Sequence, residues 1–211
     1  MDYSPIIASK LAMNTASMTA KEIAEKLKQT VLAIRLYIAS VYNSHGSYLI
    51  SCMVQKAAGM NIRDYLISRL FEPLGIEPPR WDMSPQGICC GGWGMYLPVE
   101  DMAKVGVCLL EKGMWNGKQV IPAEWIELAS QAHIPTNTVP RHREWSEGYG
   151  YHLWRCTDGR FRGDGSEGQF MIISPRQHMV VAATACTHRG DRGIELHVIN
   201  IGGDLLHKLV R

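Results

Sequence analysis

The segment of this 211-residue chain that most constrains its fold is a glycine-rich turn followed at once by an apolar strand pattern. The turn is Phe161-Arg162-Gly163-Asp164-Gly165-Ser166-Glu167-Gly168-Gln169, and it leads directly into Phe170-Met171-Ile172-Ile173-Ser174. Glycine permits backbone angles closed to other residues and lets a ligand approach the main chain without meeting a Cβ. Two interpretations follow. One is a plain hairpin turn, and the other is a ligand-binding turn to which Asp164, Ser166 and Gln169 bring polar groups.

The C-terminal part of the chain predicts a small sheet and a helix. Alternation and aromatic content predict a strand over Tyr149–Arg155, and apolar runs predict two more over Gln169–Ser174 and His178–Cys186. Links this short predict an antiparallel meander. Helical spacing of apolar residues predicts a terminal helix laid over one face of the sheet; its stripe is Ile194, Val198, Ile201, Leu205 and Leu209.

The N-terminal part predicts helices with recognisable ends. A capping box at Thr19–Glu22 predicts a helix over residues 19–36. A second helix is expected to end at Gly59, and a third to begin after Asn61 and end within Glu72–Ile76 because Pro73 cannot continue a helix. Further helices are expected after Pro98 and Pro122, a turn at Trp115–Lys118, and a polar surface loop over residues 133–148.

Helices followed by a meander predict an α+β fold, in which an antiparallel sheet of at least three strands carries the terminal helix on one face. Trp81, Trp93 and Tyr96 lie in a Pro- and Gly-rich loop, where they would either line a pocket or cover a core. Both interpretations stay open on the sequence alone.

Charge and cysteine content exclude several function classes. A formal net charge of +2 gives no electrostatic reason to expect nucleic acid or an anionic membrane as a partner. No apolar run is long enough to span a bilayer, and no secretory signal pattern stands at the start, so a cytoplasmic protein is expected. The six cysteines include no Cys-x-x-Cys pair, and His152 with Cys156 is the nearest approach to a ligand pair. We therefore expect no metal and no cofactor.

An ordered set of motifs resembles the serine β-lactamase and penicillin-binding-protein-like superfamily, in particular its class C-related branch of esterases, D-amino-acid peptidases and β-lactamase-like hydrolases. The resemblance covers about residues 42–210. Its motifs are Tyr42-Asn43-Ser44, Tyr48-Leu49, Gly59, Leu70–Ile76, Gly91-Gly92-Trp93-Gly94, Glu100–Lys104, Gly148-Tyr149-Gly150, Gly163-Asp164-Gly165 and Gly168-Gln169. The order of the set is far more specific than any one motif.

The resemblance implies acyl transfer from an ester or amide carbonyl to a serine nucleophile. In this family a Ser-x-x-Lys element activates the serine, a Tyr-x-Asn element helps move the proton, and a Lys-Thr-Gly or His-x-Gly element on a strand borders the cleft and gives a backbone N–H to the oxyanion hole. Tyr42 takes the tyrosine position here, and Ser44 replaces the usual asparagine. The third element falls on Gly163-Asp164-Gly165 without its basic residue, and Ser166 and Gln169 complete the expected substrate-binding set.

The first element departs from the family. Nowhere in the chain does a lysine follow a serine or threonine at the third position, and residues 1–41 do not resemble the family. The sequence therefore predicts a divergent leader over 1–41 and a β-lactamase-like domain over 42–211, with a helical part at 42–148 and the sheet and terminal helix at 149–211. This domain would be the C-terminal two-thirds of such a hydrolase, truncated and catalytically impaired.

Other functions remain open on the sequence. Ser17 and Lys21 stand one helical turn apart and would form a different nucleophile pair. A non-catalytic module would keep the cleft for a peptide-like or acyl ligand, and a truncated product would have no selected activity. The family's missing strands would normally lie beside His178–Cys186, so we also expect an open sheet edge there, available to a homodimer or to the helix at 19–36.

Overall fold

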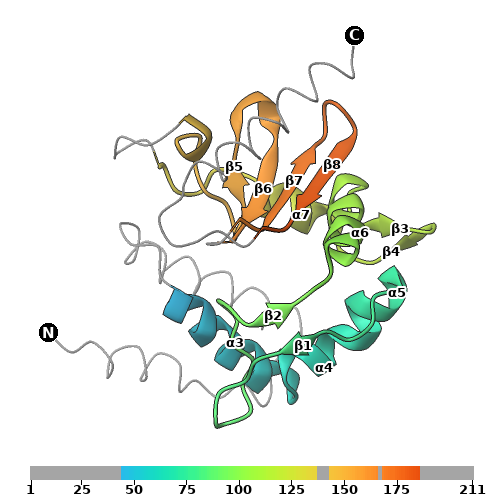
Figure 1. Ribbon diagram of the computed structural model, residues 1–211, viewed down its shortest axis with the longest axis vertical. Coiled ribbons are helices and arrows are strands. Elements are labelled where there is room, and N and C mark those ends of the chain that lie inside the picture. Colours follow the sequence, from blue (N-terminus) through green and yellow to red (C-terminus); the bar gives the residue numbers. More distant parts are fainter. Residues whose placement is uncertain (1–43, 137–142, 166–167, 186–211) are drawn as a thin grey trace, which may run out of the picture. The chain divides into compact units, whose positions relative to one another are not determined.

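The computed structural model describes residues 44–136, 143–165 and 168–185, which divide into two compact units (Figure 1). The first unit holds the described residues up to Tyr65 together with Trp81–Met95, and the second holds Leu66–Arg80 and the described residues from Tyr96 onward. The helices are α3 (Ser44–Ala58), α4 (Ile62–Leu66), the π-helix η1 (Ile67–Phe71), α5 (Glu72–Leu74), α6 (Val99–Leu110), α7 (Ala123–Ala129) and the 3-10 helices η2 (Arg143–Trp145) and η3 (Thr157–Gly159). The strands are β1 (Arg80–Trp81), β2 (Met95–Tyr96), β3 (Met114–Trp115), β4 (Lys118–Gln119), β5 (Trp154–Arg155), β6 (Phe161–Asp164), β7 (Phe170–Ser174) and β8 (Met179–Ala183).

Capping residues set the boundary between α3 and α4, as the sequence predicts. The N–H of Gly59 donates to the carbonyl of Gln55 at 2.9 Å, which closes the last turn of α3. The side-chain oxygen of Asn61 accepts a hydrogen bond of 2.9 Å from the N–H of Asp64, which satisfies a free donor at the start of α4. Both predicted ends are confirmed.

The helix after Asn61 ends within the predicted segment, but for a different reason. The backbone widens into η1, in which the N–H of Glu72 bonds the carbonyl of Ile67, and α5 then holds Pro73 in its first turn. A proline is tolerated in a first turn because its missing N–H is not needed there. The helix stops at Gly75, whose φ of 62° is left-handed and favours glycine. Pro73 is thus accommodated, and the expectation that it ends the helix is wrong.

Helix α6 begins after Pro98, with Glu100 and Asp101 in its first turn, as predicted. Its buried residue Cys108 packs with Phe71, Leu74 and Ile76 in one apolar cluster. Leu109 and Leu110 pack instead against a second cluster, whose buried members are Ile126, Phe161 and Ile173. One helix therefore contributes to two apolar clusters of the second unit.

The predicted turn at Trp115–Lys118 is a two-residue hairpin between β3 and β4. Trp115 pairs with Lys118, and the intervening Asn116 and Gly117 have φ values of 47° and 76°. These are the angles of a type I′ turn, which favours Asn-Gly because both residues need positive φ. Pro122 precedes α7, which confirms that helix as well.

The larger sheet is antiparallel, in the order β5-β6-β7-β8 (Figure 1). Ile173 and Met171 on β7 pack toward the α6 side, together with Leu109 and Leu110. Phe170 and Ile172 alternate to the opposite face, where they pack with Trp145 and Val181. The predicted α+β class is confirmed, and the four strands agree with the expected sheet of at least three. The strand that the sequence did not single out is β6, formed by Phe161–Asp164 of the glycine-rich segment.

The first predicted strand of the meander is shorter than expected. Within Tyr149–Arg155 only Trp154 and Arg155 belong to β5. The residues before them curl back, because Gly150 donates to the carbonyl of Leu153 at 2.7 Å and His152 has a φ of 58°. Aromatic alternation therefore gave the right strand but a start five residues too early.

Several predictions fall outside the described residues: the helix at 19–36, the terminal helix after 194 and the leader boundary at 41. These stay predictions. Among the helices that the structure describes, none combines the length and the apolar character needed to cross a bilayer.

Candidate functional site

The predicted site residues are distributed over the two units and the undescribed segments. Tyr42 and Ser166 lie outside the described residues. Ser44 is the first residue of α3 in the first unit, whereas Gly163, Asp164, Gly165 and Gln169 belong to the second unit. The structure brings the last four together around the β6–β7 turn. That Tyr42 faces Gly163–Gly165 across one groove stays a prediction.

In the first unit, two glycines pack directly on the first turns of α3. A Cβ on Gly92 would lie 2.6 Å from the carbonyl oxygen of Ser44 and 3.0 Å from its Cβ. A Cβ on Gly91 would lie 2.6 Å from the carbonyl oxygen of Ser47. Since real Cβ atoms do not approach backbone this closely, only glycine lets the loop sit against the segment that carries Ser44.

The burial and contacts of Trp81, Trp93 and Tyr96 bear on whether these residues cover a core. Trp81 is half-buried, and its indole N–H donates to the carbonyl of Cys90 at 2.9 Å, so it supports the loop. Trp93 is 47% exposed and stacks on Tyr48 with ring centroids 6.3 Å apart. Tyr96, in the second unit, is 52% exposed beneath the guanidinium of Arg80. Neither Trp93 nor Tyr96 covers a core.

In the second unit, the C-terminal end of β6 presents a backbone edge. The N–H of Gly165 donates to the carbonyl of Gln169 at 2.8 Å, and antiparallel pairing then alternates along β6. The N–H of Asp164 therefore points away from β7. Strand β5 pairs only with Phe161 and Arg162, so it does not reach this edge. A donor in this orientation is what an oxyanion-binding strand needs.

The Asp164 carboxylate is held inside the protein rather than offered to solvent. Its oxygen lies 3.1 Å and 3.2 Å from the Nη2 and Nε of Arg162, and the side chains of Trp154 and Trp145 hydrogen-bond it as well. Burial raises the pKa of this carboxyl, and the charge and hydrogen bond of Arg162 lower it only in part. Its contribution to a ligand site would thus come from its backbone.

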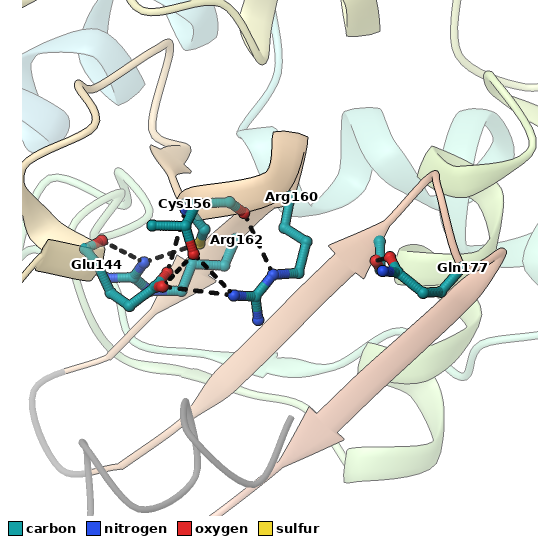
Figure 2. A network of polar contacts seen from close by, with 7 residues as sticks. Glu144, Cys156, Arg160, Arg162 and Gln177 are labelled. Carbon is teal, nitrogen blue, oxygen red and sulfur yellow. Dashed lines mark hydrogen bonds and ion pairs between the residues drawn. The ribbon is translucent and has the colours of Figure 1, made fainter. Parts of the chain in front are cut away.

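Arg162 is the centre of a buried polar network (Figure 2). It is 0% exposed, and its Nη1 donates at 2.9 Å both to the carbonyl of Glu144 and to the Sγ of Cys156. Arg160 lies 3.4 Å from the Glu144 carboxylate, which also accepts from the hydroxyl of Thr157. Burial raises the pKa of the Cys156 thiol, and Arg162 opposes that shift. The network fixes β6 to the segments on either side of it.

Sequence reasoning missed this network. Residues 133–148 were expected to form a polar surface loop, but Glu144 within them is only 7% exposed. It is buried because Arg160 and Thr157 supply the partners that its carboxylate needs. The sequence signal that could have revealed the network is the period of two along a strand, which places the side chains of Arg162 and Asp164 on the same face of β6.

The side chains that could hold a metal ion are scattered over the described residues. No group of three or more potential ligands gathers there, and Cys156 is bonded by Arg162 while His152 is exposed. An open hollow of about 430 Å³ lies in the second unit, lined in part by Ser130, Glu147 and Arg155. None of the predicted site residues that the structure describes is among its lining residues. The turn between β7 and β8 is tied locally by a hydrogen bond from Ser174 to Gln177 (Figure 2).

The chain shares its fold with solved hydrolases of the β-lactamase and penicillin-binding-protein-like type. A protein assigned as a 6-aminohexanoate-dimer hydrolase from Bacillus anthracis matches with a TM-score of 0.64 and 20% identity over 80% of this chain and 44% of its own. A β-lactamase from Mycobacterium bovis gives a TM-score of 0.60 and 19% identity over 78% of this chain and 64% of its own. EstCE1, a hydrolase with promiscuous acyltransferase activity, gives 0.59 and 14% over 77% and 56%.

These matches confirm, at the level of fold, the resemblance drawn from the sequence motifs. The chain spans 44%, 64% and 56% of the three matched structures, so it corresponds to part of each. Neither the models of known protein families nor the sequences of characterised proteins match it.

Proposed function

We propose that this chain is a β-lactamase-related hydrolase homologue of the ester and amide acyl-transfer class, impaired in catalysis because it lacks the Ser-x-x-Lys element. Its structural neighbours are β-lactamase- and acyltransferase-like hydrolases. The observation that carries the proposal is the edge of β6, where the N–H of Asp164 points away from β7 beyond the end of β5.

The β6 edge would stabilise negative charge on a carbonyl oxygen. The buried Arg162 compensates the Asp164 carboxylate, so that carboxylate would repel a developing oxyanion less than a free one would. A single oxyanion-hole donor contributes about 2.7–4 kcal/mol to the transition state. The edge is thus suited to polarise an ester or amide.

The nucleophile is the missing part of this chemistry. None of the 211 residues forms a Ser-x-x-Lys element, so no lysine stands one turn from a serine in the family's pattern to take its proton. Sites that retain only an oxyanion hole and binding still accelerate hydrolysis by roughly 10³–10⁴-fold over water. We expect residual ester hydrolysis of at most this size and no covalent acyl-enzyme.

Covalent labelling tests the proposal. The protein is incubated with a fluorophosphonate probe and with a fluorescent penicillin, and labelling is quantified by mass spectrometry alongside hydrolysis of p-nitrophenyl acetate. No stoichiometric label is expected with either probe. One label per chain on a serine would overturn the impairment.

The variant Ser17→Ala separates the other nucleophile pair from the proposal. Hydrolysis of p-nitrophenyl acetate should be unchanged in this variant, because Ser17 has no assigned role. If the activity of the unaltered protein exceeds 10⁴-fold over water and disappears in Ser17→Ala, the nucleophile is Ser17 and the chain is an active hydrolase of another pattern.

A further inference from the structure

The open hollow in the second unit lies between segments that the backbone ties closely together. It measures about 430 Å³ and is lined by residues that follow α7, by residues next to and within β5, and by η3. The N–H of Tyr151 donates to the carbonyl of Ala129 at 2.9 Å. A Cβ on Gly150 would lie 2.0 Å from the same oxygen, so only glycine lets these two segments approach so closely. The hollow is therefore preformed, and its volume is that of a small-molecule site.

Arg155 brings to this hollow a positive charge that no described carboxylate balances. Its side chain is half-buried, and its Nη1 donates to the carbonyl of Ser130 at 3.1 Å. That neutral oxygen takes one of the five N–H donors of the guanidinium. In the part of the chain that the structure describes, no carboxylate forms an ion pair with Arg155. The donors that remain suit a ligand carboxylate, which a guanidinium binds through two parallel hydrogen bonds.

Two carboxylates, those of Glu147 and Asp158, border the same hollow. Both residues are exposed, and neither forms an ion pair with any residue that the structure describes. Together with Arg155 they give the lining one positive and two negative formal charges. An ammonium group would be attracted by either carboxylate.

These three charges discriminate between classes of small ligand. A plain carboxylate would gain from Arg155 but would also meet two negative charges, and a plain amine would meet the guanidinium. A zwitterion can place its carboxylate at Arg155 and its ammonium group at Glu147 or Asp158, so each of its charges has a partner. We propose that the hollow binds a small zwitterion of the amino-acid class, with one carboxylate and one ammonium group. No described residue of the β6 edge lines the hollow, so this site does not depend on the proposed acyl-transfer function.

Ligand-observed saturation-transfer NMR at pH 7.5 and low ionic strength tests the site. The probes are glycine, β-alanine and 4-aminobutyrate, in which the two charges move apart by one methylene at a time. Each is compared with the carboxylate and with the amine of the same carbon skeleton, such as butyrate and propylamine for 4-aminobutyrate. The unaltered protein should bind at least one zwitterion about tenfold more tightly than either singly charged analogue, a difference of roughly 1.4 kcal/mol.

Substitutions that remove charge from the lining should change which probe binds best. Arg155→Gln leaves the two carboxylates, so the amine should bind at least as tightly as the zwitterion. Glu147→Gln combined with Asp158→Asn leaves the guanidinium, so the carboxylate should bind at least as tightly as the zwitterion. Asp158 has a φ of 61°, which asparagine also tolerates, so the backbone of η3 is retained. A role in packing alone would weaken all three probes together without changing their order.

Glu124 on α7 provides a matched control, because it is exposed and is not among the lining residues. Glu124→Gln should leave the preference for the zwitterion unchanged. The proposal is overturned if the unaltered protein prefers no zwitterion, if the charge variants keep the original order of probes, or if Glu124→Gln removes the preference. Thermal unfolding checks that each variant is folded. If Arg155→Gln does not fold, because Ser130 loses its donor, the carboxylate variant decides alone.

Discussion

Replacing Arg162 by methionine should destabilise the fold strongly, because the change leaves a buried carboxylate without its cation. Arg162 is 0% exposed, and the Asp164 side chain that it pairs with is 14% exposed. At 3.1 Å their gross attraction is about 5 kcal/mol for an effective dielectric constant of 20. Methionine fills much of the same volume, so cavity formation contributes little.

Breaking a buried ion pair by removing one partner costs about 3–5 kcal/mol. For a chain of this length that lowers Tm by roughly 6–20 °C, at about 2–4 °C per kcal/mol. Urea unfolding at pH 7.5 followed by far-UV circular dichroism measures the loss. The exposed Arg176 provides the control, since Arg176→Met should change stability by no more than about 0.5 kcal/mol.

The loss of stability caused by Arg162→Met should also depend on pH. Burial raises the pKa of Asp164 and Arg162 lowers it, so in Arg162→Met that pKa rises further. A carboxyl whose pKa is higher in the folded state than in the unfolded state, where it is about 3.9, stabilises the fold at pH values below about 3.9. This stabilisation is lost as the pH rises through the pKa of the folded state. The Arg162→Met penalty should therefore be smaller at pH 4 than at pH 7.5.

Two results would refute the reasoning. One is a penalty below about 1 kcal/mol at pH 7.5, and the other is a penalty that does not fall at pH 4. The double variant Arg162→Met, Asp164→Asn adds a further check. Since it removes both charges, it should be more stable at pH 7.5 than Arg162→Met alone.

Three other changes test the packing of the helices and the sheet edge. A Cβ at Gly106 would lie 2.6 Å from Cγ1 of Val180, so Gly106→Ala should lower the free energy of unfolding in urea by roughly 1–3 kcal/mol. Adding Val180→Ala to that variant should restore part of the loss. Asn61→Ala should cost about 1 kcal/mol by thermal unfolding, because the cap on the N–H of Asp64 is lost, and an unchanged Tm would argue against that cap. The alternation of β8 directs the N–H of Ala182 away from β7, so Ala182→Pro should block pairing of this edge in the expected homodimer. The variant should sediment as a monomer, whereas the unaltered chain should sediment as a dimer. A monomer in both cases would refute edge pairing.

The sequence predicted those elements whose signals are local. Asn61, Asn116 with Gly117, and Pro122 each act through their own backbone angles or hydrogen bonds, and the structure places turns and helix starts at all of them. Pro73 misled because the backbone widens into a π-helical turn before it, and neither this turn nor the burial of Phe71 and Leu74 in one cluster has a local signal in the sequence.

The candidate site was predicted less completely, for the same physical reason. The glycine-rich segment is visible in the sequence, but the side chains that hold it are not. Arg162 bonds Glu144 across 18 residues of sequence, and either residue alone is typical of a solvated surface. The stacking of Trp93 on Tyr48 likewise joins distant segments, so the sequence left the role of Trp93 open.

Helix α6 contributes to two of the apolar clusters of the second unit, and this has a consequence for how that unit opens. Cys108 belongs to one cluster, and Leu109 and Leu110 to the other, so neither cluster can come apart while the other keeps this turn in place. Backbone amides near Cys108 should therefore be among the last in the second unit to exchange with deuterium. Loss of packing in one of the two clusters should also speed the exchange of amides in the other.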